Sequence, residues 1–437
     1  MAQAALFCSS CHRRFDEVGG IPLLVSDSQR QRFHWGRLLA SFQAETHQAT
    51  LALSQSLLEP RLLHKTRRRL ELVRAALTPQ AERIVKLFDD AGITAIAQAG
   101  DLANSMQDVP DSLLSYFTLI HRDYGWAPES NEAAQSVEDL LCVLPGGFKL
   151  GRTLVLGAGT GRLAWDLALK LEEGAPVVAL DLNPLPLLVS ARLLAGEEVS
   201  LFELPGHPLR SDLAAIDRRL VAPPKMPPGL QLLFADGLAP PVKNQSWDTV
   251  ITPWFLDQVP DNLATLLPMV RQFLAPGGSW IHTGPFVYNP ERTSPAHRYS
   301  GDEFIQLCQA SGFQVEKATY EAKDYLVSPL SSQSRRETVL YMQATLGAPP
   351  KSSAQVDPRW CVEEGRTISI PTSFTTQLGD APHPMVALVA RLIDGKRSTV
   401  DIVAELILSG RLEDDGSAEA AVRACLQLIA KANAASS

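Results

Sequence analysis

A glycine-rich turn near the middle of the chain constrains the fold more than any other stretch. The apolar run at residues 152–156 leads into Gly157-Ala-Gly-Thr-Gly161, and residues 162–169 have the composition of a helix. Glycines let the backbone turn sharply and approach a ligand closely, while the start of a helix offers unpaired N–H groups. The pattern predicts a strand, a turn and a helix that together bind a nucleotide-like cofactor.

The spacing of these glycines distinguishes two classes of cofactor. Gly157, Gly159 and Gly161 follow the pattern G-x-G-x-G, and the last glycine of the dinucleotide fingerprint G-x-G-x-x-G is replaced by Arg162. The spacing therefore favours S-adenosyl-L-methionine (SAM) over NAD. We expect the three glycines and Arg162 to hold the methionine end of SAM.

Three acidic residues follow later strands of the same predicted domain. Residues 151–346 alternate strands and helices, as in a doubly wound α/β fold, and Asp181, Asp236 and Asp257 each end or follow an apolar run. Ligands bind at the carboxyl ends of the strands in such folds. Asp181 is placed to accept hydrogen bonds from the ribose, although capping of the next helix is an alternative. Asp236 is placed for the adenine amino group, and Asp257 lies where a substrate should bind.

Composition and charge limit the class of protein. A length of 437 residues predicts two or three domains, and 40 Lys and Arg against 48 Asp and Glu give a net charge of −8. This balance disfavours nucleic acid as a partner. Six scattered cysteines fit a reducing compartment, and no apolar run reaches the ~18 residues of a membrane span. We therefore expect a soluble, cytoplasmic protein that does not contact a membrane.

The chain divides into four predicted regions. Residues 1–27 contain Cys8-Ser-Ser-Cys11, which is similar to half of a zinc ribbon; because no second Cys-x-x-Cys pair follows, we expect a remnant without metal. Residues 28–130 have helical periodicity and form a module that caps the active site. Residues 131–346 form the α/β domain. Residues 355–437 are similar to a small winged-helix domain.

Several segments leave alternatives open. The polar and aromatic stretch at residues 116–126 either caps the cofactor site or only packs. The proline-rich segment at residues 196–229 predicts a surface excursion. The C-terminal domain could dock a peptide, form a homo-oligomer or act as a lid; DNA binding is disfavoured because its basic residues are offset by acidic ones.

Three motifs make a family resemblance specific. They are Gly157-Ala-Gly-Thr-Gly-Arg-Leu-Ala-Trp165, Trp247-Asp-Thr-Val-Ile-Thr-Pro-Trp-Phe-Leu-Asp257 and Ala275-Pro-Gly-Gly-Ser-Trp-Ile-His-Thr-Gly-Pro-Phe-Val-Tyr288. Over residues 116–346 the chain resembles the carnosine N-methyltransferase family of class I SAM-dependent enzymes. The resemblance implies a Rossmann-like fold and transfer of a methyl group to an imidazole ring nitrogen of a histidine derivative.

The resemblance also implies which residues contact the substrate. The family's imidazole-binding aspartate matches Asp257, and the tyrosine of its Gly-Pro-x-x-Tyr motif matches Tyr288. The histidine that the family has next is replaced by Asn289, which can form a hydrogen bond but cannot titrate. His282 and His297 are further candidate substrate contacts, with a structural role as the alternative.

These observations predict an N-methyltransferase for a small imidazole compound: histidine, a histidine dipeptide or a thiohistidine precursor of ovothiol-like compounds. Asn289 argues against carnosine itself. Where the family places paired tyrosines before its final strand, this chain has Arg335-Arg336-Glu337. Two alternatives are a methyltransferase that recruits a peptide or protein through the C-terminal domain, and a SAM-binding regulator without catalytic activity.

Overall fold

The chain is divided into two compact units, Met1–Ala348 and Pro349–Ser437. The computed structural model describes residues 6–7, 14–96, 112–171, 175–223, 227, 229–259, 262–347, 384–393, 397–412 and 417–435. Cys8 and Cys11 lie outside these residues, so the zinc-ribbon remnant stays a prediction. Within the described ranges, no helix is long and apolar enough to cross a bilayer.

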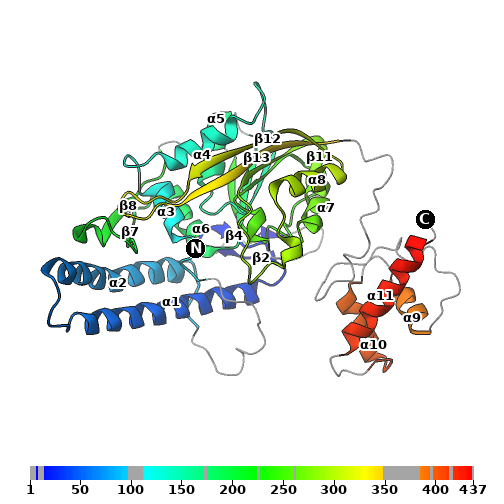
Figure 1. The fold of residues 1–437 in the computed structure, drawn as a ribbon, viewed down its shortest axis with the longest axis horizontal. Coiled ribbons are helices and arrows are strands. Elements are labelled where there is room, and N and C mark those ends of the chain that lie inside the picture. Colours follow the sequence, from blue (N-terminus) through cyan, green and yellow to red (C-terminus); the bar gives the residue numbers. More distant parts are fainter. Residues whose placement is uncertain are drawn as a thin grey trace. The chain divides into compact units, whose positions relative to one another are not determined.

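A seven-stranded sheet forms the centre of the first unit (Figure 1), in the order β12-β13-β11-β10-β5-β6-β9. Its strands are β5 Thr153–Leu156, β6 Val177–Asp181, β9 Leu230–Phe234, β10 Trp247–Pro253, β11 Leu274–Gly284, β12 Phe313–Asp324 and β13 Arg336–Leu346. In this sheet β13 is antiparallel to both neighbours, and the other pairs are parallel. The predicted Rossmann-like α/β fold is confirmed.

The side chains of the strands divide the core between the two faces of the sheet. Successive strand residues point to opposite faces. Val155 and Ala179 therefore belong to one buried cluster, which includes residues of α5 and α6, whereas Leu154 and Val178 belong to another, with residues of α7 and α8. These helices are α5 Arg162–Leu171, α6 Pro184–Leu194, α7 Leu263–Phe273 and α8 Gly301–Ala310. Because helices cover both faces, the central strands read as continuous apolar runs.

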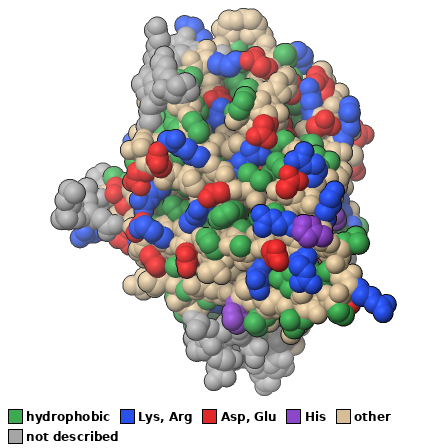
Figure 2. Space-filling view, turned by 90° about the vertical axis from the view of Figure 1, so that its left-hand side faces the viewer, with side chains coloured by type: hydrophobic (Ala, Val, Ile, Leu, Met, Phe, Trp, Pro, Cys, Tyr) green, Lys and Arg blue, Asp and Glu red, His purple; other side chains and the backbone are tan. Residues whose placement is uncertain are grey.

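Two long helices, α1 (Ser28–Ser56) and α2 (His64–Asp90), form a hairpin that extends along the lower left of Figure 1. The Asp27 side chain caps α1 by accepting a hydrogen bond from the Arg30 N–H. Trp35 anchors α1 to the body, because its buried ring contacts Phe234. Figure 2 looks at this side of the molecule, where basic and acidic side chains are interspersed rather than gathered into one broad patch.

The segment at residues 196–229 corrects a prediction. Instead of a surface excursion alone, it contains the hairpin β7 (Val199–Glu203) and β8 (Ile216–Leu220). Glu203 and Arg218 are buried as an ion pair with 2.9 Å between Oε2 and Nε, and Trp126 Nε1 donates to Glu203 Oε1 at 3.0 Å. The ion pair joins the two strands of the hairpin, and the hydrogen bond from Trp126 anchors the hairpin to the body of the unit.

The remaining elements are short or belong to the second unit. Small strands precede α1: β1 Leu6–Phe7, β2 Arg14–Phe15, β3 Glu17–Val18 and β4 Ile21–Pro22. In the second unit, α9 Pro384–Leu392, α10 Thr399–Leu408 and α11 Ala418–Ala435 pack around a core that includes Val389, Ile402 and Leu426. The winged-helix assignment stays a prediction.

Candidate active site

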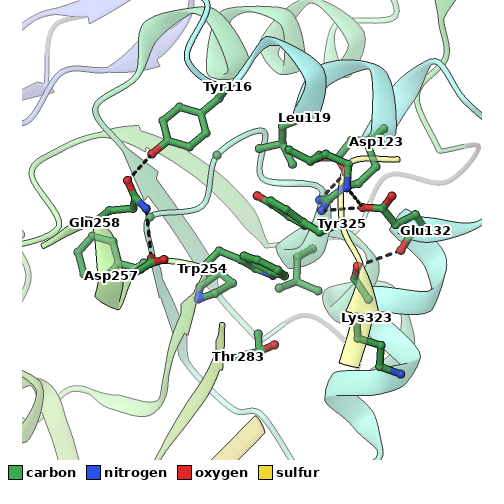
Figure 3. Close-up of a pocket in the computed structure, with 18 of the residues that line it drawn as sticks. Tyr116, Leu119, Asp123, Glu132, Trp254, Asp257, Gln258, Thr283, Lys323 and Tyr325 are labelled. Carbon is green, nitrogen blue, oxygen red and sulfur yellow. Dashed lines mark hydrogen bonds and ion pairs between the residues drawn. The ribbon is translucent and has the colours of Figure 1, made fainter. Parts of the chain in front are cut away.

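A cavity of about 1010 Å³ lies at the carboxyl ends of the central strands (Figure 3). Among the residues that sequence reasoning proposed, the cavity brings together Gly157, Gly159, Asp181, Asp236, Asp257 and Asn289. Ser115–Asn131 and α4 (Glu132–Leu141) contribute further lining residues, whereas no described residue of α1 or α2 lines it. Of the helical module predicted at residues 28–130, only its last part therefore reaches the site among the described residues.

The glycine turn leaves no space for side chains. Gly157 and Gly159 have φ angles of +69° and +57°, a region that L-residues rarely adopt. A Cβ at Gly157 would lie 2.5 Å from the Phe255 ring, and one at Gly159 would lie 2.7 Å from Leu119 Cδ2. The turn therefore requires glycine at both positions, and its bare backbone lines the cavity.

Asp181 is tied to the same turn. Its Oδ2 accepts from the Gly159 N–H and its Oδ1 from the Asn183 N–H, each at 2.8 Å. The side chain that caps α6 is that of Asn183, which accepts from the Leu185 N–H at 3.3 Å. Burial raises the pKa of Asp181, and the two N–H groups oppose that rise. Asp181 therefore lies at the cavity wall rather than acting as the helix cap.

Asp257 is a buried carboxyl group that lines the same cavity. It lies in a short 3-10 turn, Leu256–Gln258, just after β10, and is only 6% exposed. Gln258 Nε2 donates to its Oδ1 at 3.2 Å, and the Val287 N–H donates to its Oδ2 at 3.3 Å. Burial raises the pKa of Asp257 to about 6, and the nearby charge of Glu337 adds to the rise. The group is therefore mostly ionised at neutral pH and protonated below pH 6.

A polar network closes one wall; the sequence indicated the stretch at residues 116–126 but not the partners of its side chains. The network involves α3 (Phe117–Tyr124), where Arg122 Nη2 pairs with Asp123 Oδ1 at 2.7 Å. The Thr160 hydroxyl of the glycine turn donates to Asp123 Oδ2. Glu132 accepts from the N–H groups of Leu326 and Val327, at 2.8 and 3.2 Å. The polar and aromatic stretch at residues 116–126 was the signal that could have found this wall.

Trp254 and Tyr325 form a second feature that the sequence did not reveal. Their rings stack with centroids 3.7 Å apart and an interplanar angle of 9°, as Figure 3 shows. The Arg335 guanidinium lies 5.2 Å from the centroid of the Tyr325 ring. Because Trp254 and Tyr325 are far apart in sequence, only the folded sheet brings them into contact.

Five predicted site residues are not among the residues that line the cavity: Gly161, Arg162, His282, Tyr288 and His297. His282 is fully buried in β11, with Nδ1 2.9 Å from the Thr252 carbonyl oxygen, and burial lowers its pKa to about 4. Arg162 is directed to Asp166, with 2.7 Å between Nε and Oδ2. The structure therefore corrects His282 to a neutral core residue and Arg162 to a support of the turn.

Tyr288 and His297 lie beside the cavity wall rather than in it. Tyr288 packs against the apolar cluster beneath the sheet, and burial together with the charge of Asp257 raises its pKa. His297 ends the short turn Pro295–His297 and is half-buried. Of Tyr288, Asn289 and His297, only Asn289 lines the cavity. Its Oδ1 accepts from the Glu291 N–H at 2.9 Å.

Comparison with known proteins bears on this site. Residues 221–343 match the family model for carnosine N-methyltransferases. The carnosine N-methyltransferase of Dictyostelium discoideum is 26% identical over 183 residues, which are 39% of this chain and 39% of that protein. The one from Rattus norvegicus is 27% identical over 176 residues, which are 37% of this chain and 43% of that protein.

The chain thus spans about two fifths of the length of the curated relatives that it matches. A solved SAM-dependent methyltransferase from Aquifex aeolicus is also similar, with 10% identity and a TM-score of 0.34 over 54% of this chain and 99% of that one. The family match covers the end of β10, with Asp257, and the strands that follow it. It supports a methyltransferase that uses SAM.

Proposed function

We propose that the chain is a SAM-dependent N-methyltransferase that acts on an imidazole ring nitrogen of a small histidine derivative. The observation that carries the proposal is the shared cavity: both the glycine turn and the buried carboxyl group of Asp257 line it. A cofactor on the turn and an acceptor on Asp257 would therefore meet in one enclosed space.

The residues present fit SAM. The Cβ-free backbone at Gly157 and Gly159 admits a ligand, and Asp181 and Asp236 line the same wall. In the proposal, the glycines, with Gly161 and Arg162 supporting their turn, hold the methionine end, Asp181 holds the ribose and Asp236 holds the adenine. SAM supplies an electrophilic methyl group on its sulfonium.

Asp257 orients the acceptor ring. A neutral imidazole carries a proton on one nitrogen and a lone pair on the other. An ionised Asp257 accepts a hydrogen bond from the ring N–H, which leaves the lone pair of the second nitrogen free to attack the methyl carbon. The ring would become a cation as the new N–C bond forms and the methyl–sulfur bond of SAM breaks, which leaves neutral S-adenosylhomocysteine, and the carboxylate would stabilise that charge. The ring proton then leaves to Asp257 or to solvent.

The proposal also covers the identity of the substrate, the residues around it, the second unit and the cellular location. Histidine, a histidine dipeptide and a thiohistidine precursor of ovothiol all present the required ring. Tyr288 and Asn289 flank the acceptor, with His297 as an outer contact. The second unit would be a winged-helix-like domain for assembly, closure or peptide docking, and the protein would act in the cytoplasm.

A transfer assay tests the proposal. The purified full chain is incubated with methyl-labelled SAM and, separately, histidine, carnosine, 5-thiohistidine and a small-molecule extract. We expect label on the imidazole ring of at least one compound and a loss of at least about 100-fold in Asp257→Ala. The matched control is Asp217→Ala, because Asp217 is an exposed aspartate on β8 that pairs with Arg83. Label on a co-purified polypeptide alone would favour the peptide alternative. Tight SAM binding without any transfer would favour the regulator.

A further inference from the structure

An ion pair at the cavity wall is not explained by the chemistry above. Glu337 Oε1 pairs with Arg335 Nη2 where β13 begins. Alternate residues of a strand share one face, so Glu337 lies on the same side of β13 as Tyr341. Arg335 and Tyr341 both line the cavity. Glu337 itself is not among the lining residues, so of the pair Arg335 faces the cavity and Glu337 is buried next to it.

The pair is incompletely satisfied. The Glu337 side chain is only 7% exposed, and its Oε2 is buried without a hydrogen-bond partner in the part of the chain that the structure describes. An unpaired buried carboxylate oxygen is costly, and such groups normally have a partner. A guanidinium has five N–H donors, yet Arg335 is 55% exposed and uses one nitrogen on Glu337. Both an acceptor and several donors remain for a ligand.

Two of the other cations at the wall are already engaged, and a third, Arg336, lies on the opposite face of β13 from Glu337. Arg122 lies 2.7 Å from Asp123 and 3.8 Å from Glu132. Lys323 lies 3.0 Å from Asp139 and 2.7 Å from Glu321. Each is therefore neutralised by two carboxylates, which weakens its attraction for an anion. Arg335 shares a single carboxylate and is more exposed than either.

Resting on the proposed function, we propose that Arg335 and Glu337 bind the charged head of the substrate. Arg335 binds its carboxylate, and Glu337 Oε2 binds its ammonium group once Arg335 has turned towards that carboxylate. An α-amino acid carries both groups on one carbon, so the site selects a free amino acid of the histidine type. A histidine inside a peptide lacks both charges and would not satisfy the pair.

The position of the pair suits such a substrate. Glu337 lies close enough to Asp257 for its charge to act on that carboxyl group. Asp257 and Arg335 also line the same cavity, so the ring and the head of one small amino acid would bind within one space.

Binding measurements test this inference without depending on turnover. The full chain is saturated with S-adenosylhomocysteine and titrated calorimetrically with L-histidine, histamine and imidazolepropionate. Histamine lacks the carboxylate, and imidazolepropionate lacks the ammonium group. The variants are Arg335→Gln and Glu337→Gln. The matched control is Arg219→Gln, because Arg219 is an exposed arginine on β8 that pairs with Glu198.

We expect histidine to bind roughly 10-fold or more tightly than either analogue. Arg335→Gln should weaken histidine and imidazolepropionate by roughly 10- to 100-fold and leave histamine unchanged. Glu337→Gln should weaken histidine and histamine and leave imidazolepropionate unchanged. Equal affinities for the three compounds, or a variant that weakens all three alike, would overturn the inference.

Two controls keep the result interpretable. Thermal melting confirms folding, and if Glu337→Gln does not fold, the half-exposed Arg335→Gln decides the outcome alone. The predicted binding pattern without methyl transfer to histidine would refute the proposed function and leave the head-binding site standing. Transfer to an imidazole without that pattern would refute only the head-binding site.

Discussion

Trp254 and Tyr325 stack face to face, with ring centroids 3.7 Å apart, and join two strands that are not neighbours in the sheet. Trp254 follows β10 with a φ of +51°, and Tyr325 follows β12. Asp257 comes three residues after Trp254. The stack therefore fixes the chain just before the carboxyl group that faces the proposed acceptor.

Removal of the stack should impair acceptor binding. In Tyr325→Leu, Trp254 loses its ring partner, so the backbone that carries Asp257 becomes less restrained. We expect the KM for the acceptor to rise by roughly 10-fold, the KM for SAM to change little, and the free energy of unfolding to fall by about 1 kcal/mol. Steady-state kinetics and urea denaturation measure these quantities.

Tyr320→Leu is the matched control for that variant, because Tyr320 lies on β12, shortly before Tyr325, and is 52% exposed. Its kinetic constants should remain within about two-fold of the wild type. An unchanged acceptor KM in Tyr325→Leu would contradict the restraint that we assign to the stack.

Asp257→Asn should separate activity from stability. Burial raises the pKa of Asp257 from 3.8 to about 6, so the folded state binds the proton more tightly than the unfolded state. Ionisation of Asp257 therefore destabilises the fold, fully above pH 6 and not at all below about pH 4. The variant should be more stable than the wild type by about 3 kcal/mol at pH 7.5 and equal to it near pH 4.

Activity should change in the opposite direction. The rate of the wild type should rise with pH through about 6, as Asp257 ionises, and the neutral form of the substrate ring adds to that rise. The variant should lose most of the rate at every pH. Denaturant titrations at pH 4 and 7.5, together with initial rates, check both effects. A variant less stable than the wild type at pH 7.5 would contradict the assignment of a buried, destabilising charge.

Gly157→Ala should abolish SAM binding through a clash rather than through backbone strain alone. A new Cβ would lie 2.5 Å from Phe255 at a φ of +69°. Gly277 has a φ of +77° with no neighbour within 4 Å of a new Cβ, so Gly277→Ala measures the cost of strain by itself, about 1 kcal/mol. Calorimetric titration with SAM and thermal melting should show lost binding and the larger destabilisation in Gly157→Ala only. Equal behaviour of the two variants would contradict this explanation.

The alternation of strands and helices along the chain, and four residues of the cavity, followed from local patterns. Gly157, Gly159, Asp181 and Asp236 could be predicted because the end of each parallel strand meets the same edge of the sheet. For His282 the sequence left a substrate contact and a structural role open, because a strand residue can face either the ligand or the core; its burial favours the structural role. Gly161 and Arg162 belong to the turn but do not line the cavity, and the Arg162 side chain pairs with Asp166.

The sequence by itself determined the α/β fold, the glycine turn and the position of Asp257, since these depend on periodicity and on residues close together in the chain. Only the tertiary structure decided two contacts at the cavity wall. Trp254 stacks on Tyr325, and Glu132 accepts a hydrogen bond from the Leu326 N–H. The tertiary structure also buried Glu337 with Oε1 paired to Arg335 and with Oε2 lacking a hydrogen-bond partner among the described residues. The contacts of Trp254 and Glu132 join segments far apart in the sequence, and the burial of Glu337 arises only when the chain has folded.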